Sequence, residues 1–247
     1  MRTEDMQQLS SAILYWRIMN RPVVLVHGAF HGAWCWDRVT SHLDAAGVVW
    51  RAPDLPSCAN AASGAAIDED TAAVESVLDN LPGDEPAVLL GHSRGGAVIS
   101  EAGTHHRVGS LVYLTALLLE KGENPAGRIE TNLTKAMIEN VDGSFSADVS
   151  LGTELFYNDC DGDQISFATR QLRSQTLALD TRNSRQAWTE KPSIYVICTR
   201  DKAITPDTQR SMAAKANTRL EWDTGHSPFL NRPEVLAALL IGLSVGP

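Results

Sequence analysis

Short apolar runs that alternate with amphipathic stretches constrain this chain of 247 residues more than any other feature. The first run, Val23–Val26, lies between Pro22 and His27-Gly28, which is typical of a fully buried strand. Strands that alternate with helices predict an α/β fold with a mostly parallel central sheet flanked by helices. Further strands are expected at 48–50, 87–90, 111–114, 193–198 and 219–222, and helices at about 34–46, 68–80, 94–103, 206–215 and 232–243.

The stretch 117–190 breaks this alternation. It is rich in polar residues and glycines and shows helical or irregular patterns without a clear strand. An insertion of this length predicts a helical cap over the carboxyl edge of the sheet, placed before the last two strands. The core is then expected to consist of 22–116 and 191–247, and 1–21 to be an N-terminal extension without assigned chemistry.

The pentapeptide Gly91-His92-Ser93-Arg94-Gly95 follows the expected strand at 87–90 and precedes a helix. It fits G-x-S-x-G, and the strand–turn–helix context argues against a chance match. The turn is sharp, and Gly91, Gly95 and Gly96 lack side chains that would collide with neighbouring backbone. Ser93 would stand at the positive end of the helix, which favours an anionic intermediate. Ser93 is therefore the candidate nucleophile.

A serine hydroxyl needs a base, and histidine is the usual one because its pKa lies near neutrality. His226 follows the last strand and precedes the last helix, which places it at the carboxyl edge beside Ser93. A surface loop histidine is the alternative interpretation. His27 and His92 could line the same cleft, whereas His42, His105 and His106 are expected to lie away from it.

The base needs a carboxylate that holds its tautomer. Asp201 follows the strand at 193–198 and thus also lies at a carboxyl end. Asp223 is a weaker candidate because it is only three residues from His226. The alternative for Asp201 is a solvated loop acid paired with Lys202 or Arg200.

A tetrahedral intermediate needs amide donors directed at its oxyanion. The backbone N–H of Arg94, directly after the nucleophile, is one candidate. The second is expected from the loop after the first strand, with Ala29 as first choice and Phe30 and His31 as second choices.

Four segments resemble the α/β-hydrolase superfamily: 24–36, the turn 91–95, 196–202 and Gly225-His226. The resemblance covers about 22–244. More narrowly, these segments resemble one branch of the superfamily, which holds plant methyl esterases (methyl salicylate and methyl jasmonate esterases), polyneuridine aldehyde esterase, plant hydroxynitrile lyases and related bacterial carboxylesterases. It implies the α/β-hydrolase fold, a triad of Ser93, Asp201 and His226 in that chain order, and oxyanion amides at Ala29 and Arg94.

The resemblance also bears on the reaction. The lyases of this branch carry a threonine after the first strand and a lysine beside the catalytic histidine, where this chain has Gly28 and Ser227. We therefore expect a carboxylesterase-type serine hydrolase that cleaves a small ester through an acyl-enzyme. A hydroxynitrile lyase or carbon–carbon bond hydrolase on the same triad, and a weakly catalytic ligand-binding receptor, remain as alternatives.

The cap is expected to select the substrate. Most of its apolar residues pack the cap onto the core, so each single lining residue is only a candidate. The candidates for substrate contact are Phe30, His92, Leu117, Phe145, Leu155, Phe156 and Phe167, with Leu118, Tyr157 and Leu172 as further cap residues; Trp34 and Trp36 are expected to anchor the first helix in the core.

Composition limits the partners. There are 21 basic and 30 acidic residues, for a net charge of -9, which disfavours nucleic acids and anionic membranes. No apolar run reaches about 18 residues, so no membrane span is expected, and the start does not resemble a secretory signal. Four widely spaced cysteines predict free thiols in a reducing cytoplasm. The sequence predicts a small-molecule ester as partner, no metal and no cofactor, and leaves a homodimer open.

Overall fold

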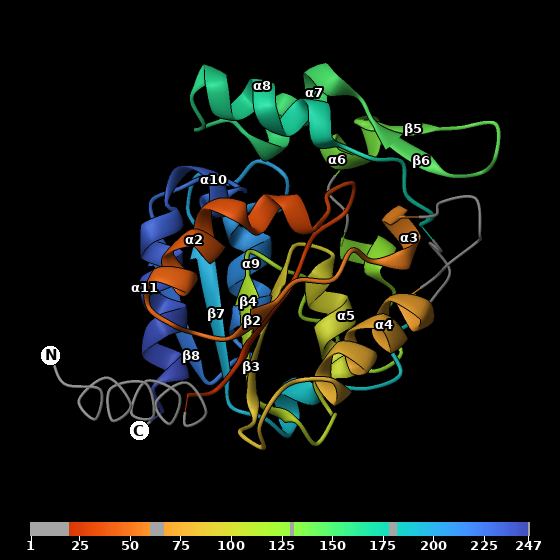
Figure 1. Cartoon of the computed structure of the whole chain (residues 1–247). Coiled ribbons are helices and arrows are strands. Elements are labelled where there is room, and N and C mark those ends of the chain that lie inside the picture. Colours follow the sequence, from red (N-terminus) through yellow and green to blue (C-terminus); the bar gives the residue numbers. More distant parts are fainter. Residues whose placement is uncertain (1–19, 60–66, 129–130, 178–181, 247) are drawn as a thin grey trace, which may run out of the picture.

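A six-stranded parallel sheet forms the centre of the molecule in the computed structural model, which describes residues 20–59, 67–128, 131–177 and 182–246 (Figure 1). Its strand order is β2-β1-β3-β4-β7-β8, and each neighbouring pair runs parallel. The expected α/β fold with a mostly parallel central sheet flanked by helices is thereby confirmed. The strands are β1 (Val23–Val26), β2 (Trp50–Arg51), β3 (Ala87–His92), β4 (Val108–Leu114), β7 (Ser193–Cys198) and β8 (Thr218–Trp222).

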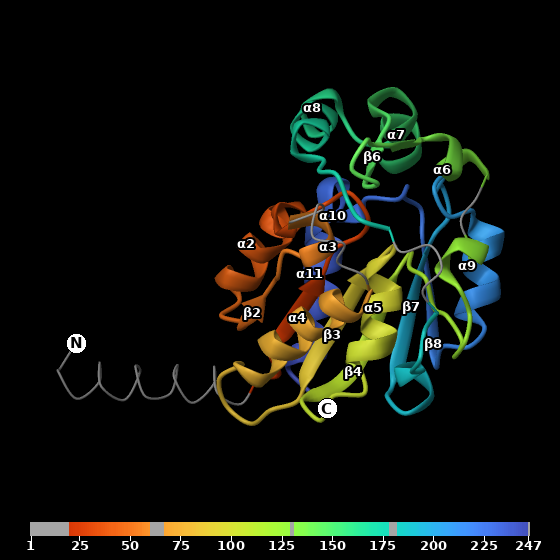
Figure 2. The ribbon, with the colours of Figure 1, turned by 90° about the vertical axis from the view of Figure 1, so that its right-hand side faces the viewer.

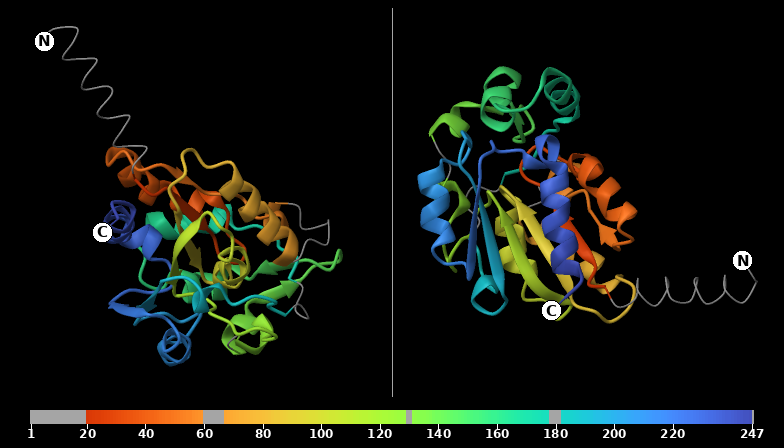
Figure 3. Two further views of the ribbon diagram at one scale, coloured as in Figure 1. Left: turned by 90° about the horizontal axis from the view of Figure 1, so that it is seen from below. Right: turned by 90° about the vertical axis from the view of Figure 1, so that its left-hand side faces the viewer.

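Helices cover both faces of the sheet, which explains why its inner strands are mostly apolar. In β1, Val24 and Val26 point to one face, and Val23 and Leu25 point to the other. The first face packs on α4 (Ile67–Asp79), α5 (Gly95–Ala102) and α9 (Pro206–Ala213), and the second on α2 (Asp37–Ala45) and α11 (Pro233–Ser244). Helices α4 and α5 lie in front of the sheet in Figure 2, and α11 lies in front of it in the right-hand view of Figure 3.

The part 131–171 of the segment between β4 and β7 lies over the carboxyl ends of the strands (Figures 1 and 2), whereas 187–189 packs beside α5. We refer to 117–190 as the cap. It holds α6 (Thr131–Lys135), β5 (Met137–Glu139), β6 (Phe145–Ala147), α7 (Val149–Phe156) and α8 (Gly162–Gln171), together with the 3-10 turns η3 (Pro125–Arg128) and η4 (Ala187–Thr189).

The expectation of a cap segment without a strand was wrong. Strands β5 and β6 pair antiparallel, with Met137 opposite Ala147. Each has three residues, which is too short for a period of two to stand out in the sequence. Gly143, with φ of +78°, supplies the left-handed conformation in their turn.

Several boundaries differ from the expectation. The second strand begins at Trp50 rather than at 48, although the Val49 carbonyl still accepts a hydrogen bond from the Val23 amide. Trp36 is fully buried as expected, but Trp34 is only half-buried and stacks on His31 with ring centres 5.4 Å apart. The first helix is preceded by a 3-10 turn, η1 (Ala33–Trp36). Two short helices complete the set: α3 (Pro56–Ala59) and α10 (Pro228–Asn231). Most of the expected extension 1–21 lies outside the described residues.

Candidate active site

Ser93 lies in a strained turn at the end of β3. Its φ of 52° falls in the left-handed region, which non-glycine residues rarely adopt. The turn is held by three backbone hydrogen bonds: the Ser93 amide donates to Leu114 (3.3 Å), and the Ser93 carbonyl accepts from Gly96 (3.0 Å) and Leu117 (2.9 Å). The side chain of Ser93 is thus presented at the carboxyl edge of the sheet, just before α5 begins.

Glycines make this turn possible because neighbouring backbone passes very close. A Cβ atom at Gly91 would lie 2.6 Å from the Gly95 carbonyl oxygen. One at Gly95 would lie 2.7 Å from the carbonyl oxygens of Val26 and His27. Both distances are far below van der Waals contact, so the expectation that these glycines allow the sharp turn is confirmed.

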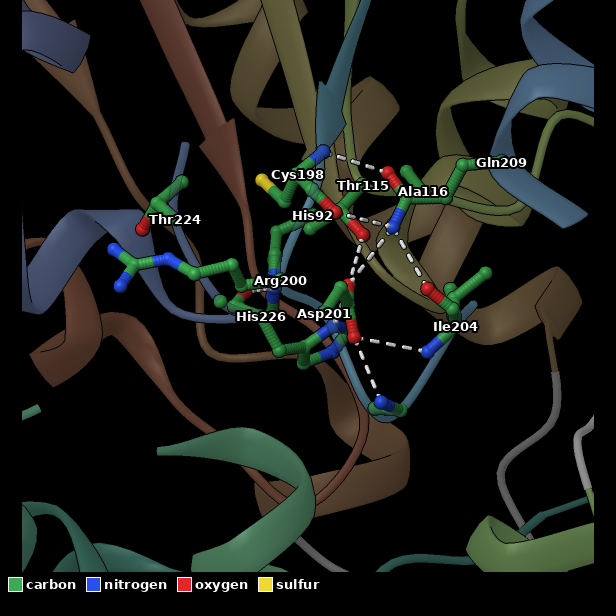
Figure 4. Close-up of polar contacts among 12 residues, drawn as sticks. His92, Thr115, Ala116, Cys198, Arg200, Asp201, Ile204, Gln209, Thr224 and His226 are labelled. Carbon is green, nitrogen blue, oxygen red and sulfur yellow. Dashed lines mark hydrogen bonds and ion pairs between the residues drawn. The ribbon is translucent and has the colours of Figure 1, made fainter. Parts of the chain in front are cut away.

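His226 and Asp201 form a buried pair (Figure 4). The His226 Nδ1 atom lies 2.7 Å from Asp201 Oδ2, and their side chains are 2% and 0% exposed. When Nδ1–H donates to the carboxylate, Nε2 carries the lone pair that can accept a proton. The loop after β8 supplies the histidine and the loop after β7 the aspartate, as the sequence predicted for both positions.

The Asp201 carboxylate is held by four further donors (Figure 4). Its Oδ1 accepts from the amides of Ala203 (2.7 Å) and Ile204 (3.0 Å). Its Oδ2 accepts from Gln209 Nε2 (3.1 Å) and from the hydroxyl of Thr115 in addition to His226. A buried carboxylate with every lone pair directed at a donor is held in one orientation.

The alternatives for the acid do not match the structure. Asp223 is 79% exposed and pairs with Arg200 (3.1 Å). The Lys202 ammonium pairs with Glu154 (3.1 Å). Asp201 is therefore not a solvated acid paired with its flanking cations.

The loop after β1 carries the candidate oxyanion donors. The Phe30 amide donates to Gln175 Oε1 (2.9 Å), so Phe30 is not free to bind an oxyanion. Among the hydrogen bonds of the described residues, none is donated by the amides of Ala29 or Arg94. Their assignment as oxyanion donors stays a prediction.

Three other histidines are buried and support the site as neutral groups. His27 Nε2 accepts from the Leu55 amide (3.0 Å), and burial lowers the pKa of His27 to about 4. His31 Nε2 lies 2.9 Å from the Tyr157 hydroxyl, and burial lowers the pKa of His31 to about 3. His92 Nε2 lies 2.8 Å from the His226 carbonyl oxygen, and burial holds the pKa of His92 well below its usual range. His92 is completely buried, and its ring contacts the backbone of His226.

The candidate substrate contacts in the cap divide into residues beside the catalytic groups and residues that pack elsewhere. Phe156 contacts both the base and the oxyanion loop, with its ring centre 5.7 Å from that of His226 and 6.4 Å from that of Phe30. Leu117 adjoins Ser93 through its amide. Phe145 pairs instead with the backbone of Gln175, and Phe167 packs on Trp34, with ring centres 5.6 Å apart.

A cleft of about 400 Å³ lies where the cap meets the loop after β7. Leu155 and Asp201 line its inner part, and charged side chains line its mouth. The complete lining is Asn132, Lys135, Leu151, Glu154, Leu155, Asp201, Lys202 and Thr205.

Sequence reasoning missed four polar residues that hold this site: Thr115, Gln209, Gln175 and Asp70, whose carboxylate pairs with the Arg94 guanidinium (2.6 Å). Thr115 directly follows the strand expected at 111–114, so its place at the carboxyl edge was a usable signal. The other three are polar residues in a helix or loop, and nothing in their spacing marks them.

In the part of the chain that the structure describes, no helix is long and apolar enough to cross a membrane. No cluster of three or more His, Cys, Asp or Glu side chains within those residues could hold a metal ion. The four cysteines are free thiols.

The family model of the alpha/beta hydrolase family matches residues 23–239, and the chain belongs to this family. Methylesterase 3 of Arabidopsis thaliana is 28% identical over 251 residues, covering 90% of this chain and 95% of the relative. The pyrethroid hydrolase of Sphingobium wenxiniae is 29% identical over 248 residues, covering 91% and 88%. These relatives agree with the expected enzyme class, a carboxylesterase-type α/β hydrolase.

Solved structures show the same fold. A pyrethroid hydrolase from Sphingobium faniae superimposes with a TM-score of 0.80 at 26% identity, covering 92% of this chain and 98% of the other. Polyneuridine aldehyde esterase superimposes with a TM-score of 0.78 at 21% identity, covering 91% and 99%. The branch expected from the sequence motifs is confirmed.

Proposed function

We propose that this protein is a serine esterase that hydrolyses a small carboxylic ester through an acyl-enzyme. The observation that carries the proposal is the buried bond between His226 Nδ1 and Asp201, at the same sheet edge as the strained Ser93 turn. Relatives whose names are methylesterase and pyrethroid hydrolase support an ester as the substrate class.

In the proposed reaction, Ser93 Oγ attacks the ester carbonyl while His226 Nε2 takes the hydroxyl proton. Asp201 stabilises the imidazolium that forms. The amides of Ala29 and Arg94 donate to the oxyanion of the tetrahedral intermediate. His226 then protonates the departing alcohol, and a water molecule activated by the same histidine releases the acid from Ser93.

The lack of room for a side chain at Gly28 argues against the lyase alternative. A Cβ atom at this position would lie 2.9 Å from the Ser93 Cβ and 2.8 Å from His92 Nδ1. The space that the lyases fill with a threonine is therefore occupied here. Ser227, which stands where they carry a lysine, is fully buried and brings no positive charge next to His226.

A covalent probe tests the proposal. A fluorophosphonate should label Ser93, and S93A should lose p-nitrophenyl acetate turnover together with labelling. S41A, on the exposed side of α2, is the matched control and should keep both. Labelling at another residue, or full turnover by S93A, would overturn the proposal.

A substrate panel separates the reaction types. Methyl esters, acetyl esters and longer acyl esters should be hydrolysed by the wild-type protein. Mandelonitrile should not be cleaved. Cleavage of mandelonitrile without ester turnover would replace the esterase by the lyase alternative.

A further inference from the structure

The cap holds the backbone of Phe30, in the loop after β1, from both sides of its peptide unit. The Phe30 carbonyl accepts from the Arg173 amide (2.9 Å), and the Phe30 amide donates to Gln175 Oε1 (2.9 Å). Phe30 has a φ of 62°, a left-handed conformation that non-glycine residues keep only when their surroundings hold it. It directly follows Ala29, so the segment that returns from the cap sets the backbone beside one proposed oxyanion donor.

The side chain of Gln175 also bonds to a residue of the core. Gln175 Nε2 donates to the Ser57 hydroxyl (2.9 Å), and Gln175 is fully buried. The Ser57 hydroxyl donates to Asp70 Oδ2 (2.7 Å), while the Ser57 amide donates to Asp70 Oδ1 (2.9 Å). Ser57 and Asp70 are also fully buried.

Asp70 ends this chain of hydrogen bonds at the nucleophile turn. Arg94 Nη1 lies 2.6 Å from Asp70 Oδ2, and the Arg94 side chain is 12% exposed. Arg94 carries the other proposed oxyanion donor. The two donors, from loops far apart in the sequence, are thus joined by one buried path.

The chemistry of these groups fixes which one donates and which one accepts at each hydrogen bond of the path. The Ser57 hydroxyl has one proton, which goes to the carboxylate, so Ser57 must accept from its other partner. Gln175 can meet this need with its NH₂ group while its oxygen accepts from Phe30. A carboxylate at 175 would bring no donor to Ser57, and an apolar side chain would leave the Phe30 amide without its partner.

We propose that Gln175, Ser57 and Asp70 are positioning residues that set both oxyanion donors, Ala29 through Phe30 and Arg94 through its ion pair, and that link them to the cap. This inference rests on the proposed esterase function. It assigns to the cap a part in the chemical step in addition to substrate selection. Direct removal of an oxyanion donor lowers kcat by about 10²–10³-fold. Because these variants displace donors rather than delete them, we expect losses of about 10–100-fold in kcat.

The test compares binding of a transition-state analogue with binding of a ground-state analogue. Q175M keeps the length of the side chain and removes both polar contacts, and Q175E removes only the donor. A phenylalkyl trifluoromethyl ketone forms an oxyanion adduct with a serine, whereas the matching alcohol does not. For both variants we expect kcat for p-nitrophenyl acetate and affinity for the trifluoromethyl ketone to fall in parallel, with affinity for the alcohol within about 2-fold of wild type.

D70N tests the other end of the path, with E75Q as its matched control on the same helix, since Glu75 pairs with Arg185 at the surface. D70N should show the same parallel losses and E75Q none. The double variant of Q175M and D70N should lose less than the product of the single losses, because both act on one path. Should D70N fail to fold, Q175M and Q175E decide the matter alone.

Several outcomes would overturn the inference. These are unchanged kcat in Q175M, a loss confined to KM, or a loss of kcat without loss of affinity for the trifluoromethyl ketone. Failure of the proposed function is seen separately, as turnover that survives in S93A. If S93A is inactive and Q175M is unaffected, only the positioning role is rejected.

Discussion

The two corners of the site are held by different parts of the molecule. The acid–base corner, Asp201 with His226, takes its side-chain partners Thr115 and Gln209 from the core (Figure 4). The oxyanion corner, the loop at Phe30 with Arg94, includes a cap residue, Gln175, among its partners. Core side chains therefore orient the Asp201 carboxylate itself, whereas a cap residue holds the backbone at Phe30. The loop that carries His226 also bonds to the cap, where Asp159 accepts from the Gly225 amide (2.6 Å).

This difference has a consequence for variation within the fold. Changes in the cap that alter substrate choice also act on the oxyanion corner through the returning segment at Arg173 and Gln175. The same changes leave the bonds of Asp201 intact, because none of its partners lies in the cap. Rate and specificity should thus be coupled directly at the oxyanion corner, and at the acid–base corner only through the contacts of the cap with the loop and the ring of His226.

The largest effect is expected from D201N. The amide would favour the wrong tautomer of His226, and kcat should fall by about 10⁴-fold. D223N is the matched control, since Asp223 lies near His226 in sequence but is exposed, and its kcat should stay within about 2-fold. Steady-state turnover of p-nitrophenyl acetate measures both. A greater loss in D223N than in D201N would identify Asp223 as the catalytic acid and contradict the description of the acid–base corner.

Q209L should have the next largest effect on the acid–base corner. A hydrogen bond to a charged group contributes about 1.5–3 kcal/mol, so its loss predicts a fall of about 10–100-fold in kcat/KM. In contrast to Q175M, the fall should appear without a selective loss of affinity for the trifluoromethyl ketone over the alcohol. D207N, on the same helix and 97% exposed, is the control. If Q209L and Q175M gave the same inhibitor profile, the two corners would not be independent.

F156L probes the cap face that contacts both corners. Phe156 is nearly buried between His226 and Phe30, and a smaller side chain enlarges the space for substrate. We expect KM values across a series of acyl chain lengths to change by about 10-fold, with smaller changes in kcat, which is the lower end of the effect that one methylene group has in an apolar pocket. V149A, at an exposed position of α7, should leave the series unchanged. An unaltered chain-length preference in F156L would remove Phe156 from the substrate-contacting residues.

The smallest effect concerns stability and pH. Burial lowers the pKa of His27 to about 4 and that of His31 to about 3, so both stay neutral in the folded protein at pH 5 to 6, where the unfolded chain binds protons. The free energy of unfolding should therefore fall as pH drops below about 6.5, by up to about 1.4 kcal/mol per pH unit for each histidine.

Urea unfolding at pH 7, 6 and 5 measures this slope. H27N removes the titrating group in the core, and H31N removes the one that contacts the cap through Tyr157. Each should flatten the slope by up to about 1.4 kcal/mol per pH unit, whereas H42N, at an exposed position of α2, should not. An unchanged slope in H27N would show that this histidine is protonated in the folded state.

The sheet and the turn at Ser93 could be predicted because their signals are local. The buried strand at 193–198 was expected with the bounds that the structure shows, since a continuous apolar run bounded by polar residues marks it. The antiparallel pair β5 and β6 could not be predicted, because two runs of three residues carry no period. Trp34 was misplaced for a related reason: its neighbours His31 and Phe167 come from two different elements, and no spacing reveals them.

By itself, the sequence determined the kind of chemistry. Glycines at 91 and 95 around Ser93, and polar residues directly after apolar strands, are properties of adjacent residues, and adjacent residues share local geometry in any fold. Only the tertiary structure decided which groups hold the site. Thr115 meets Asp201 across 86 residues, and Phe30 meets Gln175 across 145. Such contacts arise where strands and loops converge at the sheet edge, and a buried hydrogen bond of this kind follows from the direction of two side chains rather than from any repeat along the chain.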